Sequence, residues 1–346
     1  MSDKATFLKH IHYFRAFAII NVAVVHLWYI PSSVTKESYD SACSLVNIVR
    51  EVVFHDSTIY FIFISGFLFF YLSPKFELKR YYKNKLINVI SPYILMTLLV
   101  FLLNINKSIH LKFSSLFSIK QILFVFLFGK AQLQYWYIPF ISLVFLISPL
   151  LLKIPAKQFG RLVVFASFLP LLGTRTGAEV SVWQYIYFFP IYLQGAYIAM
   201  NYSNFMAIIN TRKKELGCIA VIASLLLIYL HGKTWQTGVF NFAESIYYIQ
   251  KMSISFLIIL AFKRLENKNI SVLNNFATYS FAIYFTHTLV GNGAVRNYFY
   301  NFFSVDNSLI FLVSVAYLVV IIFTTLFICM NLKRILGKKS RFLIGV

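Results

Sequence analysis

The amino-acid sequence predicts an all-α integral membrane protein with about ten transmembrane helices and both termini in the cytoplasm. Three observations predict this class. Hydrophobic residues make up 59% of the 346-residue chain, charged residues make up only 12%, and long apolar runs recur along its length. A soluble domain of this size needs more charged residues to cover its surface. We therefore expect a single membrane-embedded domain over residues 1–346, with a helical core at about 11–331 and no soluble domain.

Each apolar run is long enough, or nearly so, to cross roughly 30 Å of hydrocarbon at about 1.5 Å per residue. The predicted spans are residues 11–31, 52–73, 86–104, 135–153, 161–174, 181–200, 216–231, 243–262, 272–291 and 309–331. The fifth and the seventh are the shortest. Residues 119–129 form a further apolar stretch that is too short to span, and we interpret it as a re-entrant or interfacial helix.

The basic residues are distributed as the positive-inside rule predicts. With the N-terminus in the cytoplasm, the inner segments carry most of the 32 Lys and Arg residues, and each of them holds at least three. An even number of spans returns the C-terminus to the same side. The formal charge of +21 therefore reflects membrane topology, and we expect no nucleic-acid partner. The three cysteines are widely separated, so the sequence suggests neither a disulfide framework nor a metal site.

The first predicted span contains two ionisable residues, Arg15 and His26, in the stretch FRAFAIINVAVVH. At about 100° per residue, their spacing makes close to three full turns, so both project from nearly the same face. The rise of about 16 Å puts Arg15 near the cytoplasmic mouth and His26 beyond the midplane. Arg15 is then either an interfacial anchor or part of a polar passage, and His26 is either a packing residue or a reactive base.

Two further features follow in the second span and the segment after it. Ser65 and Gly66 interrupt the aromatic stretch YFIFISGFLFFYL, where a small-residue packing notch is the simpler interpretation. The basic loop over residues 74–93 carries five cations between Lys75 and Lys85. It either fixes the topology or holds an anionic, phosphate-bearing donor beside Arg15.

Together these motifs resemble the membrane acyltransferase-3 family, whose members O-acylate sugars and surface polysaccharides. The first-helix signature of that family pairs an Arg with a later His, as Arg15 and His26 do. Five more elements match in family order up to about residue 290: FIFISGFLFF, KNKLINVISPY, LQYWYIPFISLVFLISPLLLK, YFFPIYLQGAYIA and FATYSFAIYFTHTLV. The basic stretch departs from the family pattern, because Lys85 and Asn88 stand where arginines are common.

The resemblance implies transfer of an acyl group, most often acetyl, from a cytoplasmic acyl-CoA co-substrate to a hydroxyl of a glycan, polysaccharide or glycolipid precursor. It implies no bound cofactor and no metal. His26 and Arg15 are the implied catalytic residues, and His26 acts either as the base or as a transient acyl carrier. The implied contacts to the donor phosphates are Arg15, Arg80, Lys83 and Lys85. The expected acceptor contacts, or supports of the catalytic pair, are His287, Tyr284, Glu244, Ser65 and Trp136.

Simpler interpretations of these last residues also stay open. His287 follows Tyr284 by three residues on about the same face, and it either packs, binds the acceptor or takes part in catalysis. Glu244 either orients a histidine or is an ordinary interfacial carboxylate. Trp136 either stacks on a sugar or belongs to an aromatic belt.

Two other functions remain open on the sequence alone: export of polysaccharide, and a non-catalytic place in a glycan-assembly complex. The expected partners are the lipid bilayer, a glycan or lipid-linked sugar, and other glycan-assembly proteins. The resemblance implies a multi-pass protein of the bacterial cytoplasmic membrane.

Overall fold

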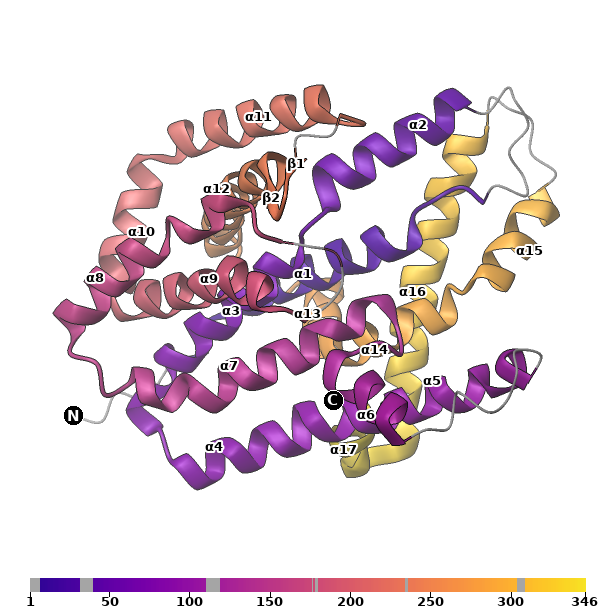
Figure 1. The fold of residues 1–346 in the computed structure, drawn as a ribbon, viewed down its shortest axis with the longest axis horizontal. Coiled ribbons are helices and arrows are strands. Elements are labelled where there is room, and N and C mark those ends of the chain that lie inside the picture. Colours follow the sequence, from indigo (N-terminus) through magenta and orange to yellow (C-terminus); the bar gives the residue numbers. More distant parts are fainter. Residues whose placement is uncertain are drawn as a thin grey trace.

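The structure, a computed structural model, is a bundle of α-helices (Figure 1). It describes residues 7–31, 40–109, 119–175, 177, 180–233, 236–303 and 309–346. One short antiparallel hairpin, β1 (Gln236–Thr237) with β2 (Phe240–Asn241), is the exception to the helical structure within these ranges. The all-α class predicted from the sequence is therefore confirmed.

The helices are numbered in chain order. The first half contains α1 (Lys9–Leu27), α2 (Asp40–Val49), α3 (Thr58–Tyr71), α4 (Leu78–Lys85), α5 (Ser91–Ile109), α6 (Ile119–Phe128), α7 (Tyr137–Leu151) and α8 (Ala156–Ala166). The second half contains α9 (Val182–Met200), α10 (Tyr202–Thr211), α11 (Lys213–Leu230), α12 (Phe242–Arg264), α13 (Ser271–Thr278), α14 (Ser280–Val290), α15 (Gly293–Phe303), α16 (Ile310–Leu336) and α17 (Ser340–Leu343).

Six helical segments among the described residues are long and apolar enough to cross a membrane, so the chain is a membrane protein. They are Lys9–Leu27, Ala42–Tyr71, Leu78–Leu103, Leu133–Leu151, Phe242–Arg264 and Ile310–Leu343. Helices α9 and α11 have 19 and 18 residues, which is close to a spanning length, but they are not among the six. The count of ten spans and the side of each terminus remain predictions.

The second predicted span, 52–73, begins too late. The chain is already helical in α2, continues through a π-helical turn at Arg50–Phe54, and breaks before α3. The break lies at Asp56, whose φ of 59° is in the left-handed region. An aspartate tolerates that conformation better than the surrounding β-branched and aromatic residues do. The span is therefore two helices joined at a polar hinge.

Three other expectations also need correction. Most of the basic loop at 74–93 is helical, because α4 runs through a π-helical turn at Leu86–Ile90 directly into α5. The fifth predicted span, 161–174, is wrong as a single helix, since α8 ends at Ala166 and a 3₁₀ turn follows. The ninth, 272–291, is two helices, α13 and α14, that meet at Tyr279.

Helix α1 is central in the bundle and contacts α3, α12, α13, α14 and α16 (Figure 1). Helix α3 packs against α9 through two glycines. A Cβ added to Gly66 would lie 2.0 Å from the Tyr192 carbonyl oxygen, and one added to Gly195 would lie 2.1 Å from the Phe63 carbonyl oxygen. Gly66 is thus the packing notch, and it lets the two backbones approach closely.

Candidate active site

Helix α1 contributes to two separate cavities, one near each end. Arg15 lines a cavity of about 470 Å³, which we call the arginine cavity. His26 lines a second cavity of about 910 Å³, which we call the histidine cavity. The two residues project from nearly the same face of α1, as their spacing predicts, yet they face different chambers.

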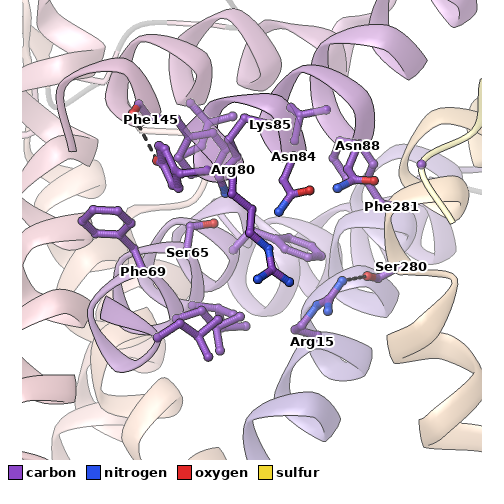
Figure 2. A pocket seen from close by; sticks show the side chains of 18 of the residues that line it. Arg15, Ser65, Phe69, Arg80, Asn84, Lys85, Asn88, Phe145, Ser280 and Phe281 are labelled. Atoms are coloured by element: carbon purple, nitrogen blue, oxygen red, sulfur yellow. Dashed lines mark hydrogen bonds between the residues drawn. The ribbon is translucent and has the colours of Figure 1, made fainter. Parts of the chain in front are cut away.

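The arginine cavity gathers cations from three separate segments. Arg15 comes from α1, Lys75 from the turn after α3, and Arg80 and Lys85 from α4. Arg15 and Arg80 extend into the same space from opposite sides (Figure 2). Glu77 is the one carboxylate in the lining. Among the residues that the structure describes, no carboxylate forms an ion pair with these four cations.

Neutral side chains hold some of these cations in place. The Nη2 of Arg15 donates a hydrogen bond to the Ser280 hydroxyl at 3.0 Å. The Nζ of Lys85 lies 3.5 Å from the ring centroid of Phe145. Ser65 also lines the cavity, beside the packing glycine. Lys83, which we expected to bind the donor, is exposed on another face of α4 and does not line this cavity.

Charges in the histidine cavity are paired with one another. Arg50 contacts Glu51 at 2.8 Å through its Nη2, and the Nδ1 of His55 lies 2.8 Å from the other Glu51 oxygen. The Nε2 of His55 lies 2.8 Å from the Nη1 of Arg175 and 3.4 Å from Oε1 of Glu244. Both ring nitrogens of His55 are therefore engaged.

A buried ion cluster supports one side of this cavity. The Nε of Arg175 lies 3.1 Å from Oδ1 of Asp56, and its Nη1 lies 3.2 Å from Oε1 of Glu244. Tyr187 donates a hydrogen bond of 2.7 Å to the other Asp56 oxygen. Burial opposes the charge of Arg175, but the carboxylates of Glu244 and Asp56 outweigh burial and raise the pKa of Arg175.

The sequence analysis did not identify His55 and Asp56. Glu244 does lie beside a histidine, but that histidine is His55 and not His26. A signal for the missed pair is present in the sequence, because a His-Asp dipeptide is unusual in the middle of an apolar stretch such as VVFHDSTIY. Arg175 was not predicted as a site residue, since nothing local in the sequence links it to Asp56.

The two cavities are separated by a wall that includes α14 and the 3₁₀ turn at Leu133–Trp136. Tyr284, which lines the arginine cavity, donates a hydrogen bond to the carbonyl of Gln134, which lines the histidine cavity. The Nε2 of Gln134 donates to Thr288 at 2.7 Å, and the Tyr135 hydroxyl donates to the carbonyl of Phe285 at 3.0 Å. These bonds fix the turn against α14.

His287 lies in α14, and its ring is beside that of His26 in α1. The two ring centroids are 5.6 Å apart, and the rings are tilted by 41°. His287 is fully buried, whereas His26 is partly exposed and lines the histidine cavity.

The comparison with protein families agrees with the resemblance that the motifs indicated. A family model described as an acyltransferase domain matches residues 8–333, which is nearly the whole chain. The chain belongs to the acyltransferase-3 family. No curated protein and no solved structure gives a significant match.

In this acyltransferase, the structure divides the predicted site residues between the two cavities. Arg15, Ser65, Arg80, Lys85 and Tyr284 line the arginine cavity. His26 and Trp136 line the histidine cavity, while Glu244 and His287 lie behind its lining side chains and contact them. The candidate site residues are therefore divided between two cavities on either side of the wall.

Proposed function

We propose that this acyltransferase transfers an acetyl group from acetyl-CoA, bound in the arginine cavity, to a hydroxyl of an uncharged sugar in the histidine cavity. The observation that carries this proposal is the contrast in charge between two adjoining cavities. One holds an excess of cations without ion-pair partners, and the other holds charges that are already paired. A donor and an acceptor of different charge fit these two environments.

The arginine cavity suits a polyanionic donor. Four cations face one carboxylate there, and the two arginines offer planar forks that match phosphate oxygens at two points. Coenzyme A carries several phosphate charges, whereas the acyl group that it delivers is small and neutral. The acyl end can therefore reach toward the wall at Tyr284 while the phosphates stay among the cations.

The histidine cavity suits an acceptor that is rich in hydroxyl groups but carries no net charge. Its arginines are occupied by Glu51, Asp56 and Glu244, so an anionic acceptor would gain little from them. Trp136 and Tyr29 are aromatic residues of the same lining, although Trp136 is mostly buried and the guanidinium of Arg296 lies 3.5 Å from the centre of the Tyr29 ring. These features favour a neutral sugar of a glycan, polysaccharide or lipid-linked precursor.

The proposed reaction needs one base. The acceptor hydroxyl oxygen attacks the thioester carbonyl carbon while His26 takes the hydroxyl proton. The carbon–sulfur bond then breaks, and the departing thiolate receives the proton from His26. An ester and free coenzyme A result, and no other reactant is consumed.

The location follows from the charge distribution. The positive-inside rule supports an arginine cavity on the cytoplasmic side, where acyl-CoA is made, and a histidine cavity toward the outside. We propose a multi-pass protein of the bacterial cytoplasmic membrane, which works beside other glycan-assembly proteins.

Mass spectrometry of surface glycans tests this function. Cells in which the protein carries His26→Ala should lose glycan acetylation, while the protein level and the polymer export stay normal. Unchanged acetylation in that variant would contradict the proposal. Polymer trapped inside the cell would instead support the export function.

A further inference from the structure

The orientation of His287 is fixed by a backbone hydrogen bond. Its Nδ1 lies 2.8 Å from the carbonyl oxygen of Ile283, one helical turn earlier. Because a carbonyl oxygen only accepts, Nδ1 must carry the proton. A doubly protonated ring would be an unpaired charge in a fully buried place, which is costly. His287 is therefore the neutral tautomer with a bare Nε2.

That bare nitrogen has no hydrogen-bond partner among the described residues, although it is buried. Buried polar atoms without a partner are uncommon in proteins and call for an explanation. The imidazole beside it belongs to His26, at 5.6 Å between ring centroids. No hydrogen bond joins the two rings as they stand, and rotation of the His26 ring would turn one of its N–H groups toward Nε2 of His287.

We propose that His287 is the positioning residue for His26, and this inference rests on the proposed function. Nε2 of His287 accepts the N–H of one His26 ring nitrogen and so leaves the other nitrogen unprotonated toward the histidine cavity. The Asp of a Ser-His-Asp triad orients its histidine by the same logic. In this protein the neutral imidazole of His287 has the role of that Asp, and the Ile283 carbonyl fixes the orientation of the ring.

The proton balance of the reaction is unchanged by this arrangement. The free nitrogen of His26 takes the acceptor proton and later gives it to the thiolate, while the N–H toward His287 stays bonded throughout. His287 keeps its own proton on Nδ1 and touches neither substrate. His55 does not suit the same task, because its two nitrogens already contact Glu51, Arg175 and Glu244.

The test compares histidine variants in membranes supplied with radiolabelled acetyl-CoA. The initial rate of label incorporation into the membrane glycan fraction is measured over a range of acetyl-CoA concentrations. His287→Leu should lower the maximal rate on the order of 100-fold, as the loss of an oriented base does. The apparent KM for acetyl-CoA should stay unchanged, since the donor cavity lies across the wall.

Two further variants separate positioning from simple packing. His287→Gln should be at least tenfold faster than His287→Leu, because the side-chain carbonyl of glutamine can accept the His26 N–H. The double variant His26→Ala/His287→Leu should be no slower than His26→Ala alone, since His287 acts only through His26. His231→Leu, at an exposed histidine outside both cavities, is the matched control and should keep the wild-type rate.

Three results would overturn the inference: a wild-type rate in His287→Leu, equal losses in the Leu and Gln variants, or a double variant slower than His26→Ala. A raised KM that accompanies the loss would likewise indicate a packing role. Failure of the proposed function looks different, because His26→Ala itself would then incorporate label at the wild-type rate.

Discussion

Tyr284 and Gln134 lie on opposite sides of one wall and are joined by a hydrogen bond from the tyrosine hydroxyl to the Gln134 carbonyl. Tyr284 faces the arginine cavity, and Gln134 faces the histidine cavity. In the proposed function the acyl end of the donor has to pass this contact before the acceptor oxygen can bond to its carbonyl carbon. The geometry of the wall should therefore matter for the rate more than for donor binding.

Tyr284→Phe tests the importance of the wall. The substitution removes the bond to Gln134 while it keeps the ring, at a cost of about 0.5–1.5 kcal/mol. We expect transfer to slow by roughly two- to tenfold, with unchanged acetyl-CoA affinity in the purified protein. Tyr185→Phe is the control, because Tyr185 donates to the Phe140 carbonyl at 3.4 Å and lines neither cavity. Weaker acetyl-CoA binding in Tyr284→Phe would instead indicate that the Tyr284 hydroxyl contacts the donor.

Arg80 and Lys83 make a matched pair of cations on α4. Arg80 projects into the arginine cavity (Figure 2), whereas Lys83 is exposed outside its lining. We expect Arg80→Gln to weaken acetyl-CoA binding by about ten- to a hundredfold, because charge-assisted bonds contribute about 1.5–3 kcal/mol. Lys83→Gln should bind as the wild type does. Calorimetric titration of the detergent-solubilised protein with acetyl-CoA measures both, and equal effects would count against a specific phosphate site.

Arg175→Leu tests the buried ion cluster. It leaves Asp56 and Glu244 buried without their cation, a change that costs about 3–5 kcal/mol in comparable cases. We expect a clearly lower Tm in detergent. The control is Arg212→Gln, which breaks the exposed Arg212–Glu215 pair and should leave Tm nearly unchanged. Similar Tm values for the two variants would show that the cluster adds no stability.

Gly66→Ala tests the contact of α3 with α9. The new methyl group would meet the Tyr192 carbonyl, and backbone cannot move aside cheaply, so we expect a low yield of folded protein. Gly217→Ala in α11 is the control, because no atom lies within 4 Å of its added Cβ. Its yield should equal or exceed that of the wild type. Normal folding of Gly66→Ala, measured by size-exclusion chromatography, would disprove a tight packing role.

Local sequence was sufficient to predict most long helices. The apolar runs at 181–200, 216–231 and 243–262 correspond closely to α9, α11 and α12. The breaks were harder to predict, because the chain stays apolar across them. The hinge at Asp56 depends on a partner, Arg175, that is remote in sequence.

Most of the candidate site residues were predicted from the sequence, but their division between two cavities was not. Helical spacing correctly put Arg15 and His26 on one face of α1, and it suggested a continuous polar stripe between them. Three residues lie between Arg15 and His26 on this face: Ile19, Val22 and Ala23. All three are buried, and of them only Val22 lines a cavity, the histidine cavity. The wall that interrupts the stripe comes from α14 and from the turn before α7, and periodicity within one helix contains no information on such contacts.

The buried cluster of Asp56, Arg175 and Glu244 joins the start of α3, the segment before α9 and the start of α12. Sliding of these elements would separate charges that are at most 15% exposed, so we expect this half of the histidine cavity to move as one unit. The opposite half is formed by the turn at 132–134, which hydrogen bonds hold against α14, and by residues 291–294 at the start of α15. Neither segment contains a charged residue. A substitution in these uncharged segments can therefore reshape the histidine cavity without leaving a buried charge unpaired, whereas a substitution in the ion cluster cannot.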